Sequence, residues 1–111
     1  MNVYDKAYEL AKSLRESAEA QALQAAKQAV DSDADAKRSL DGFMERQHKL
    51  HHQMMSGEEP SPGELEQMNK LYEVLTLNPL ISKYFDAERR FSVLFEDVNR
   101  ILGEGLKSLL D

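Results

Sequence analysis

The sequence has no cysteine and no tryptophan, and among its 111 residues only five are glycine and three are proline. Without cysteine the chain can form no disulfide, thiolate nucleophile, iron–sulfur cluster or cysteine-ligated zinc site. Few glycines and prolines leave few places for tight turns, and only eight residues are valine, isoleucine or threonine. Because strands favour β-branched residues, whereas the abundant leucine, alanine and glutamate favour helices, the composition predicts an all-α fold.

The sequence also lacks a long apolar run and an excess of positive charge. No stretch approaches the roughly 18 apolar residues of a membrane span, and the first 20 residues carry charges throughout. The net charge is −6, and residues 58–111 hold 6 basic and 11 acidic groups. Because phosphate backbones and anionic lipids repel an acidic surface, we expect neither nucleic acid nor a membrane as partner. Since the first 20 residues do not read as a signal segment, we expect a cytoplasmic protein.

Apolar periodicity and capping residues predict a single helical domain over residues 1–111, built as an antiparallel bundle of about four to five helices. The predicted helices cover about 2–17, 18–30, 33–56, 62–77 and 79–110. The clearest boundary is Ser61-Pro62-Gly63-Glu64, with Ser at the N-cap, Pro at the first helical position and Glu at the third. Around Ser17 the pattern leaves open whether the first two helices are separate or continuous.

The long C-terminal helix is too large for a compact chain of this size to cover. Residues 79–110 would extend about 48 Å as one helix, whereas a chain of this length has a radius of gyration of about 13 Å. Its apolar residues spread over an arc of about 140°. Either the helix bends at Gly103 or Gly105, or a second chain covers the excess. We expect the protein to self-associate.

A second apolar stripe, on the helix predicted over 33–56, also indicates an interface. Two methionines and two histidines recur at spacings of four, three and four residues, which places them on one side of the helix. They are too apolar for a solvated face and too mixed for the core of a monomer. We interpret the stripe as a contact in a homodimer or higher oligomer, or with another regulatory protein, and add two residues of the last helix as candidate contacts. The six candidate interface residues are Met44, His48, His51, Met55, Phe85 and Arg89.

The spacing of the histidines also indicates an alternative function, which is metal binding. His48 and His52 stand four residues apart, a spacing at which two imidazoles on a helix can share a metal ion. A usable site needs a third ligand, and Lys49 stands where an H-E-x-x-H metalloprotease has glutamate. No nucleophile elbow, phosphate-binding glycine loop or dinucleotide fingerprint is present. The sequence therefore predicts a non-enzymatic protein with no catalytic, cofactor or metal residues. The alternative is a metal-binding helical protein or enzyme that uses His48 and His52.

Three segments carry a recognisable combination of motifs: a G-E-E-P-S loop at 57–61, an N-P cap within 77–81, and an A-E-R-R-F helix segment within 84–91. With this combination the chain resembles the YlbF/YmcA/YheA-like family of small bacterial helical proteins, and its YheA-like branch in particular. The resemblance spans nearly the whole chain and implies a cytoplasmic, self-associating helical protein. Because some relatives are non-catalytic regulators that assemble with partner proteins, it also implies a regulatory adaptor with no catalytic residues to carry over.

Overall fold

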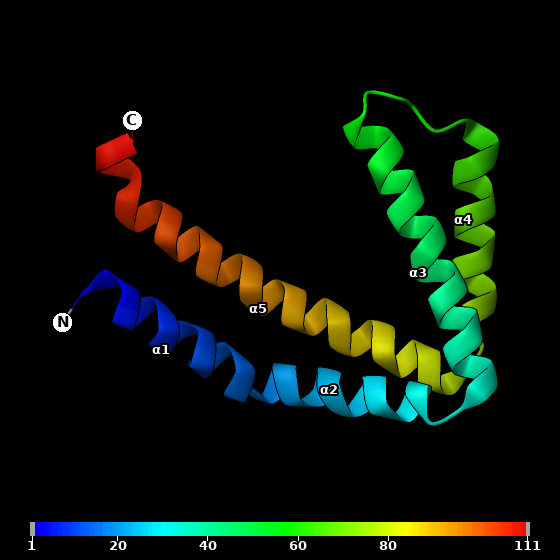
Figure 1. The fold of residues 1–111 in the computed structure, drawn as a ribbon, viewed down its shortest axis with the longest axis horizontal. Helices are drawn as coiled ribbons and strands as arrows, with labels where there is room; N and C mark the ends of the chain where they lie inside the picture. The colour runs from blue at the N-terminus through cyan, green and yellow to red at the C-terminus, as the bar shows by residue number, and fades with distance from the viewer. Residues whose placement is uncertain (1, 111) are drawn as a thin grey trace. The chain divides into compact units, whose positions relative to one another are not determined.

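The computed structural model describes residues 2–110, and these fold into five α-helices with no strand among them (Figure 1). This confirms the predicted all-α bundle with a long C-terminal helix. The elements in chain order are α1 (Val3–Glu16), α2 (Ala18–Asp31), α3 (Ala34–Met55), α4 (Pro62–Leu75) and α5 (Pro79–Leu110).

Side-chain caps determine where several helices begin. The side chain of Asn2 accepts a hydrogen bond from the Asp5 amide at 2.8 Å, and Ser61 accepts one from the Glu64 amide at 3.1 Å. Ser17 separates α1 from α2, because its hydroxyl donates to the Leu14 carbonyl at 2.7 Å and accepts from the Ala20 amide at 3.1 Å. The first two helices are therefore separate.

The ends of the later helices differ little from the expected ranges. Helix α4 ends at Leu75, two residues before the expected position 77, and Thr76 forms its C-cap. Helix α5 is continuous from Pro79 to Leu110 through both of its glycines, and Figure 1 shows its last turns bending away from the line of the preceding ones.

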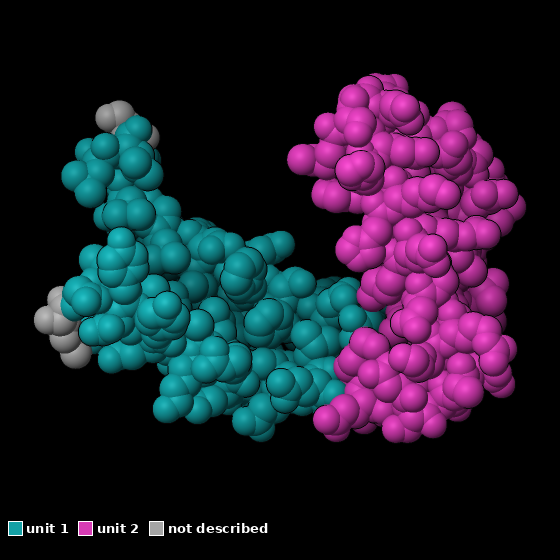
Figure 2. Space-filling view, viewed as in Figure 1, with its two compact units in different colours: residues 1–26, 84–111 teal, residues 27–83 magenta. Residues whose placement is uncertain are grey.

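The chain divides into two compact units, coloured separately in Figure 2. Unit 1 consists of residues 1–26 and 84–111, and unit 2 consists of residues 27–83. Each unit contains buried apolar residues. The single helical domain expected over 1–111 stays a prediction.

In unit 1, α1 and the start of α2 run beside α5 (Figure 1), and residues of α2 and α5 line a common groove. The buried side chains of this unit are mostly small or aromatic: Ala20, Ala26, Tyr84, Phe85 and Ala87. Alanine lets helices approach closely but buries little area. Unit 1 thus covers only part of the broad apolar face of α5.

In unit 2, α3 and α4 form an antiparallel helical hairpin. Gly57 lies in the connection with a φ of 89°, a left-handed conformation that favours glycine. The buried apolar residues of the unit are Val30, Ala36, Leu40, Phe43, Leu75 and Ile81. The two helices lie close together at one end and diverge toward the connecting loop (Figure 1).

The charged side chains of residues 2–110 pair only along single helices. Nine ion pairs are present, and each joins residues three or four positions apart. Such exposed pairs contribute about 0–1 kcal/mol each. Within the same residues no polar side chain is buried, and no helix is long and apolar enough to cross a membrane.

Candidate interaction surfaces

The methionine–histidine stripe predicted on α3 lies at the surface of unit 2. Met44 is half-buried, His48 and His51 are exposed, and Met55 is 75% exposed. At about 100° per residue these four side chains share one side of α3. The structure therefore brings them together as one face, and their role as a contact stays a prediction.

The two candidate contacts on α5 have different surroundings. Phe85 is only 6% exposed, and its ring lies 5.9 Å from that of Tyr84. It belongs to the interior of the single chain and offers no open surface. Arg89 is exposed, and its guanidinium lies 2.6 Å from a carboxylate oxygen of Asp86. Its charge is therefore already paired within α5.

The histidine cluster has no further ligand near it. Across residues 2–110, no three histidine, cysteine, aspartate or glutamate side chains gather closely enough to hold a metal ion. His48, His51 and His52 are all exposed on α3. A site based on His48 and His52 would thus have two protein ligands, whereas zinc sites use at least three.

The last ten residues of α5 form an apolar surface that nothing in the described chain covers. Every residue from 101 to 110 is exposed. Among them, three leucines recur at spacings of four and three, so they lie on one side of the helix with an isoleucine beside them. We call this the α5 tail surface: Ile101, Leu102, Leu106 and Leu109.

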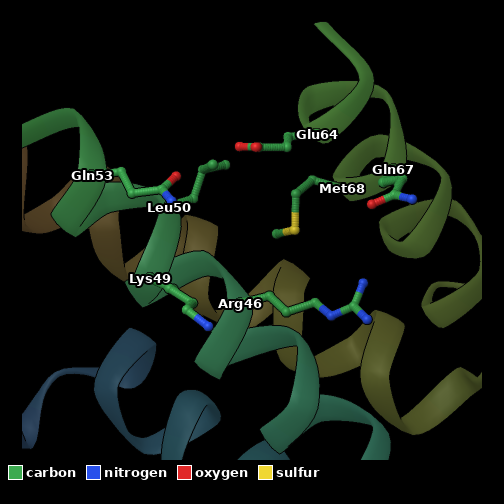
Figure 3. A pocket seen from close by; sticks show the side chains of 7 residues that line it. All are labelled: Arg46, Lys49, Leu50, Gln53, Glu64, Gln67 and Met68. Atoms are coloured by element: carbon green, nitrogen blue, oxygen red, sulfur yellow. The ribbon is translucent and has the colours of Figure 1, made fainter. Parts of the chain in front are cut away.

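A groove opens between the diverging ends of α3 and α4, with a volume of about 300 Å³. Figure 3 shows Glu64 and Met68 extending from α4 toward α3, with Leu50 on the opposite wall. Its walls combine apolar side chains, amides and charged groups. We call it the hairpin groove, lined by Arg46, Lys49, Leu50, Gln53, Glu64, Gln67 and Met68.

A second groove, in unit 1, has a volume of about 640 Å³ between the start of α2 and α5. Its walls are small apolar side chains and two arginines, and it includes the predicted contact Arg89: Ala18, Glu19, Ala22, Ala87, Arg89, Arg90 and Val93. Both guanidinium groups already pair with Asp86. The sequence pattern indicated Arg89 but neither groove.

The sequence and the helical fold match those of a known class of bacterial proteins. A family model described as "Control of competence regulator ComK, YlbF/YmcA" matches residues 3–107. The chain belongs to this family, which confirms the resemblance found in the sequence. It is 39% identical over 109 residues to the UPF0342 protein SAG1376 of Streptococcus agalactiae, covering 98% of both chains.

Solved structures show the same fold. A protein of unknown function (DUF964) from Bacillus stearothermophilus has a TM-score of 0.86 and 26% identity, with 96% of this chain and 94% of that chain covered. YheA from Bacillus subtilis has a TM-score of 0.74 and 29% identity, with 98% and 99% covered. Bacillus subtilis RicA, solved in complex with RicF, has a TM-score of 0.65, with 98% and 96% covered. At 16% identity, this last likeness shows the fold alone.

Proposed function

We propose that this chain is a non-catalytic regulatory adaptor that acts as a homo-oligomer in the cytoplasm and offers helical surfaces to another regulatory protein. The α5 tail surface carries the proposal. Leu106 is 46% exposed and Leu109 is 77% exposed. Contiguous exposed apolar patches usually mark protein contacts, because leaving them in water is costly.

The rest of the molecule supports binding rather than chemistry. General acid–base catalysis needs titratable groups with shifted pKa values in a sheltered cleft. The exposed Asp31, whose pKa is lowered by its hydrogen bond with Lys27, lines neither groove. The family description, control of a competence regulator, is that of a regulatory protein.

The family comparison also supports assembly between helical chains. RicA shares the fold and was solved in complex with RicF. A protein with this fold can therefore assemble with another protein. We extend that property to this chain as part of the proposal, without assigning it RicF as partner.

Sedimentation velocity at low micromolar concentration tests self-association. The wild-type chain should sediment above the single-chain mass of 12.6 kDa. Leu106→Glu should lower the mass to that of one chain, because it places a charge in the apolar contact. Lys107→Glu is the matched control, since it adds the same side chain one residue further on, at about 100° around the helix. A wild-type chain that stays single would contradict the proposal.

The methionine–histidine stripe on α3 is a second proposed contact, either between copies or with the other protein. If the stripe joins copies of this chain, Met44→Glu and Met55→Glu together should lower the oligomer mass. If it binds another protein, the same changes should abolish that binding and leave the oligomer mass unchanged. The stripe loses this role if neither the oligomer mass in light scattering nor capture of a partner from the native cytoplasm changes.

A further inference from the structure

We propose that the hairpin groove of one chain binds the α5 tail surface of a second copy. The proposal rests on the proposed homo-oligomer and names the two surfaces through which the copies meet.

The groove is the uncovered continuation of the core of unit 2. The apolar seam of α3 begins with three buried residues, and the side chains that follow on the same seam are more exposed. Leu50 is half-buried, and Met54 is 56% exposed. The covered part of the seam consists of Ala36, Leu40 and Phe43.

Along α4 the exposure of the apolar side chains also increases toward the loop that connects α3 and α4, which here lies at the start of the helix. Leu75, near the closed end of the hairpin, is buried, whereas Met68 is half-buried and Leu65 is 46% exposed. Apolar side chains from both helices therefore face a gap that the described chain does not fill. Filling such a gap with apolar atoms recovers both the hydrophobic and the van der Waals contributions.

Two cations of the groove wall lack an ion partner in the described chain. Eight of the 14 lysines and arginines form ion pairs, and Arg46 and Lys49 are among the six that form none. Glu45 stands four residues before Lys49, yet the two side chains make no ion pair. With Glu64 as its one carboxylate, the groove wall has a net charge of +1.

The α5 tail surface has the form and charge that the groove lacks. Leu102, Leu106 and Leu109 provide anchors at spacings of four and three, the pattern by which an amphipathic helix occupies an apolar groove. The C-terminal end of a helix carries a partial negative charge. In the sequence, Glu104 and Lys107 lie on this last segment and Asp111 follows it, so residues 101–111 have a net charge of −1, although Glu104 also pairs with Arg100 along α5.

The charges favour this pairing over two grooves placed face to face and over two tails placed in parallel. Two grooves placed face to face would bring together two walls of net positive charge. Two α5 tails placed side by side in parallel would bring together two negative helix ends. A groove that binds a tail joins opposite charges, with Arg46 and Lys49 near the negative end of the helix.

Cysteine crosslinking distinguishes these arrangements without background, because the chain has no cysteine of its own. Met68→Cys and Leu106→Cys chains, carrying tags of different length, are co-expressed under reducing conditions and then oxidised. The expected product on a non-reducing gel is the mixed disulfide between the two tags. Lys70→Cys, on the exposed side of α4, replaces Met68→Cys as the matched control and should give no mixed product.

The other products overturn the inference in distinguishable ways. A dominant Leu106→Cys self-adduct means that the tails pair with each other, so the homo-oligomer stands and the groove assignment fails. A dominant Met68→Cys self-adduct means that two grooves face each other, so again the homo-oligomer stands and the assignment of the tail to the groove fails. If the wild-type chain is oligomeric but the cysteine variants form no disulfide, the inference alone fails, whereas a wild-type chain of single mass defeats the proposed function with it.

Charge reversal provides a second test by sedimentation equilibrium. Arg46→Glu with Lys49→Glu should weaken self-association at least tenfold at low salt, and by less at high salt, where charges are screened. Arg38→Glu reverses a solvated cation on the same helix and should change it little. If both changes weaken self-association equally, Arg46 and Lys49 have no special role in it, and the assignment of the α5 tail surface to the hairpin groove is wrong.

Discussion

The ring of Phe43 on α3 lies 6.1 Å from the ring of Tyr72 on α4, inclined to it by 48°. This pair marks the closed part of the α3–α4 hairpin. Toward the connecting loop, Leu50 and Met68 are only half-buried, and the hairpin groove opens between them. The contact of the two rings therefore separates the covered part of unit 2 from the part that we assign to a second copy.

Removing one ring of this pair should destabilise the fold. Tyr72→Ala is expected to lower the free energy of unfolding by about 2 kcal/mol, because a tilted aromatic pair contributes about 0.5–1.5 kcal/mol beyond its buried area. Glu73→Ala, on the next and exposed residue of α4, is the control and should change it by less than about 0.5 kcal/mol. Urea denaturation followed by circular dichroism measures both; equal midpoints would show that the ring contact contributes nothing.

A core substitution should have a larger effect. Leu40 is 1% exposed, and truncating a fully buried leucine leaves a cavity. Leu40→Ala should therefore cost about 2–5 kcal/mol. The neighbouring exposed Ser39→Ala should be nearly neutral in the same denaturation experiment. A cost below about 1 kcal/mol for Leu40→Ala would indicate that unit 2 collapses around the missing atoms.

Two glycines should respond to alanine with opposite signs. Gly57 has a φ of 89°, where an L side chain is strained, so Gly57→Ala should destabilise the protein by about 1 kcal/mol. Gly103 lies within α5 with nothing within 4 Å of an added Cβ, so Gly103→Ala should stabilise α5 by about 0.5–1 kcal/mol. Thermal unfolding of both variants checks the signs. A stabilising Gly57→Ala would disprove the turn assignment.

The carboxyl group of Asp31 should titrate below its ordinary range. Its oxygen lies 2.6 Å from the Lys27 ammonium, and this hydrogen bond lowers the pKa of Asp31. Because the folded-state pKa lies below the unfolded one, any stabilisation is present above the ordinary pKa and is lost as the pH falls through the lowered value. Lys27→Gln should raise the pKa again, as followed by the carboxyl chemical shift in NMR, while Lys37→Gln should raise it less.

Local signals in the sequence predicted much of the fold. Ser61 and Pro62 identified the start of α4, because a cap and a missing amide act within one turn. The continuity of α5 followed from its unbroken apolar periodicity. The end of α4 was expected at 77, since Leu77 continues the apolar pattern, but Thr76 caps the helix first.

The candidate surfaces could be predicted less well, because periodicity reports which side of a helix is apolar and not what covers it. Phe85 was interpreted as a contact and is buried. The hairpin groove was missed because Leu50 continues the same seam as Phe43, and the divergence of α3 from α4 depends on packing. One signal was present: Arg46 has no acidic residue three or four positions away to pair with along its helix.

The ion pairs of residues 2–110 are all confined to single helices, and this affects how one packed helix can be replaced by another. Because none of these ion pairs joins two helices, moving an adjacent helix away breaks none of them and leaves no newly unpaired ion to be resolvated. Contacts between apolar side chains are not directional, so they set few requirements on the orientation of the helix that takes the vacated place. We therefore expect selectivity among incoming helices to depend less on the apolar side chains than on the two unpaired cations of the groove wall, Arg46 and Lys49.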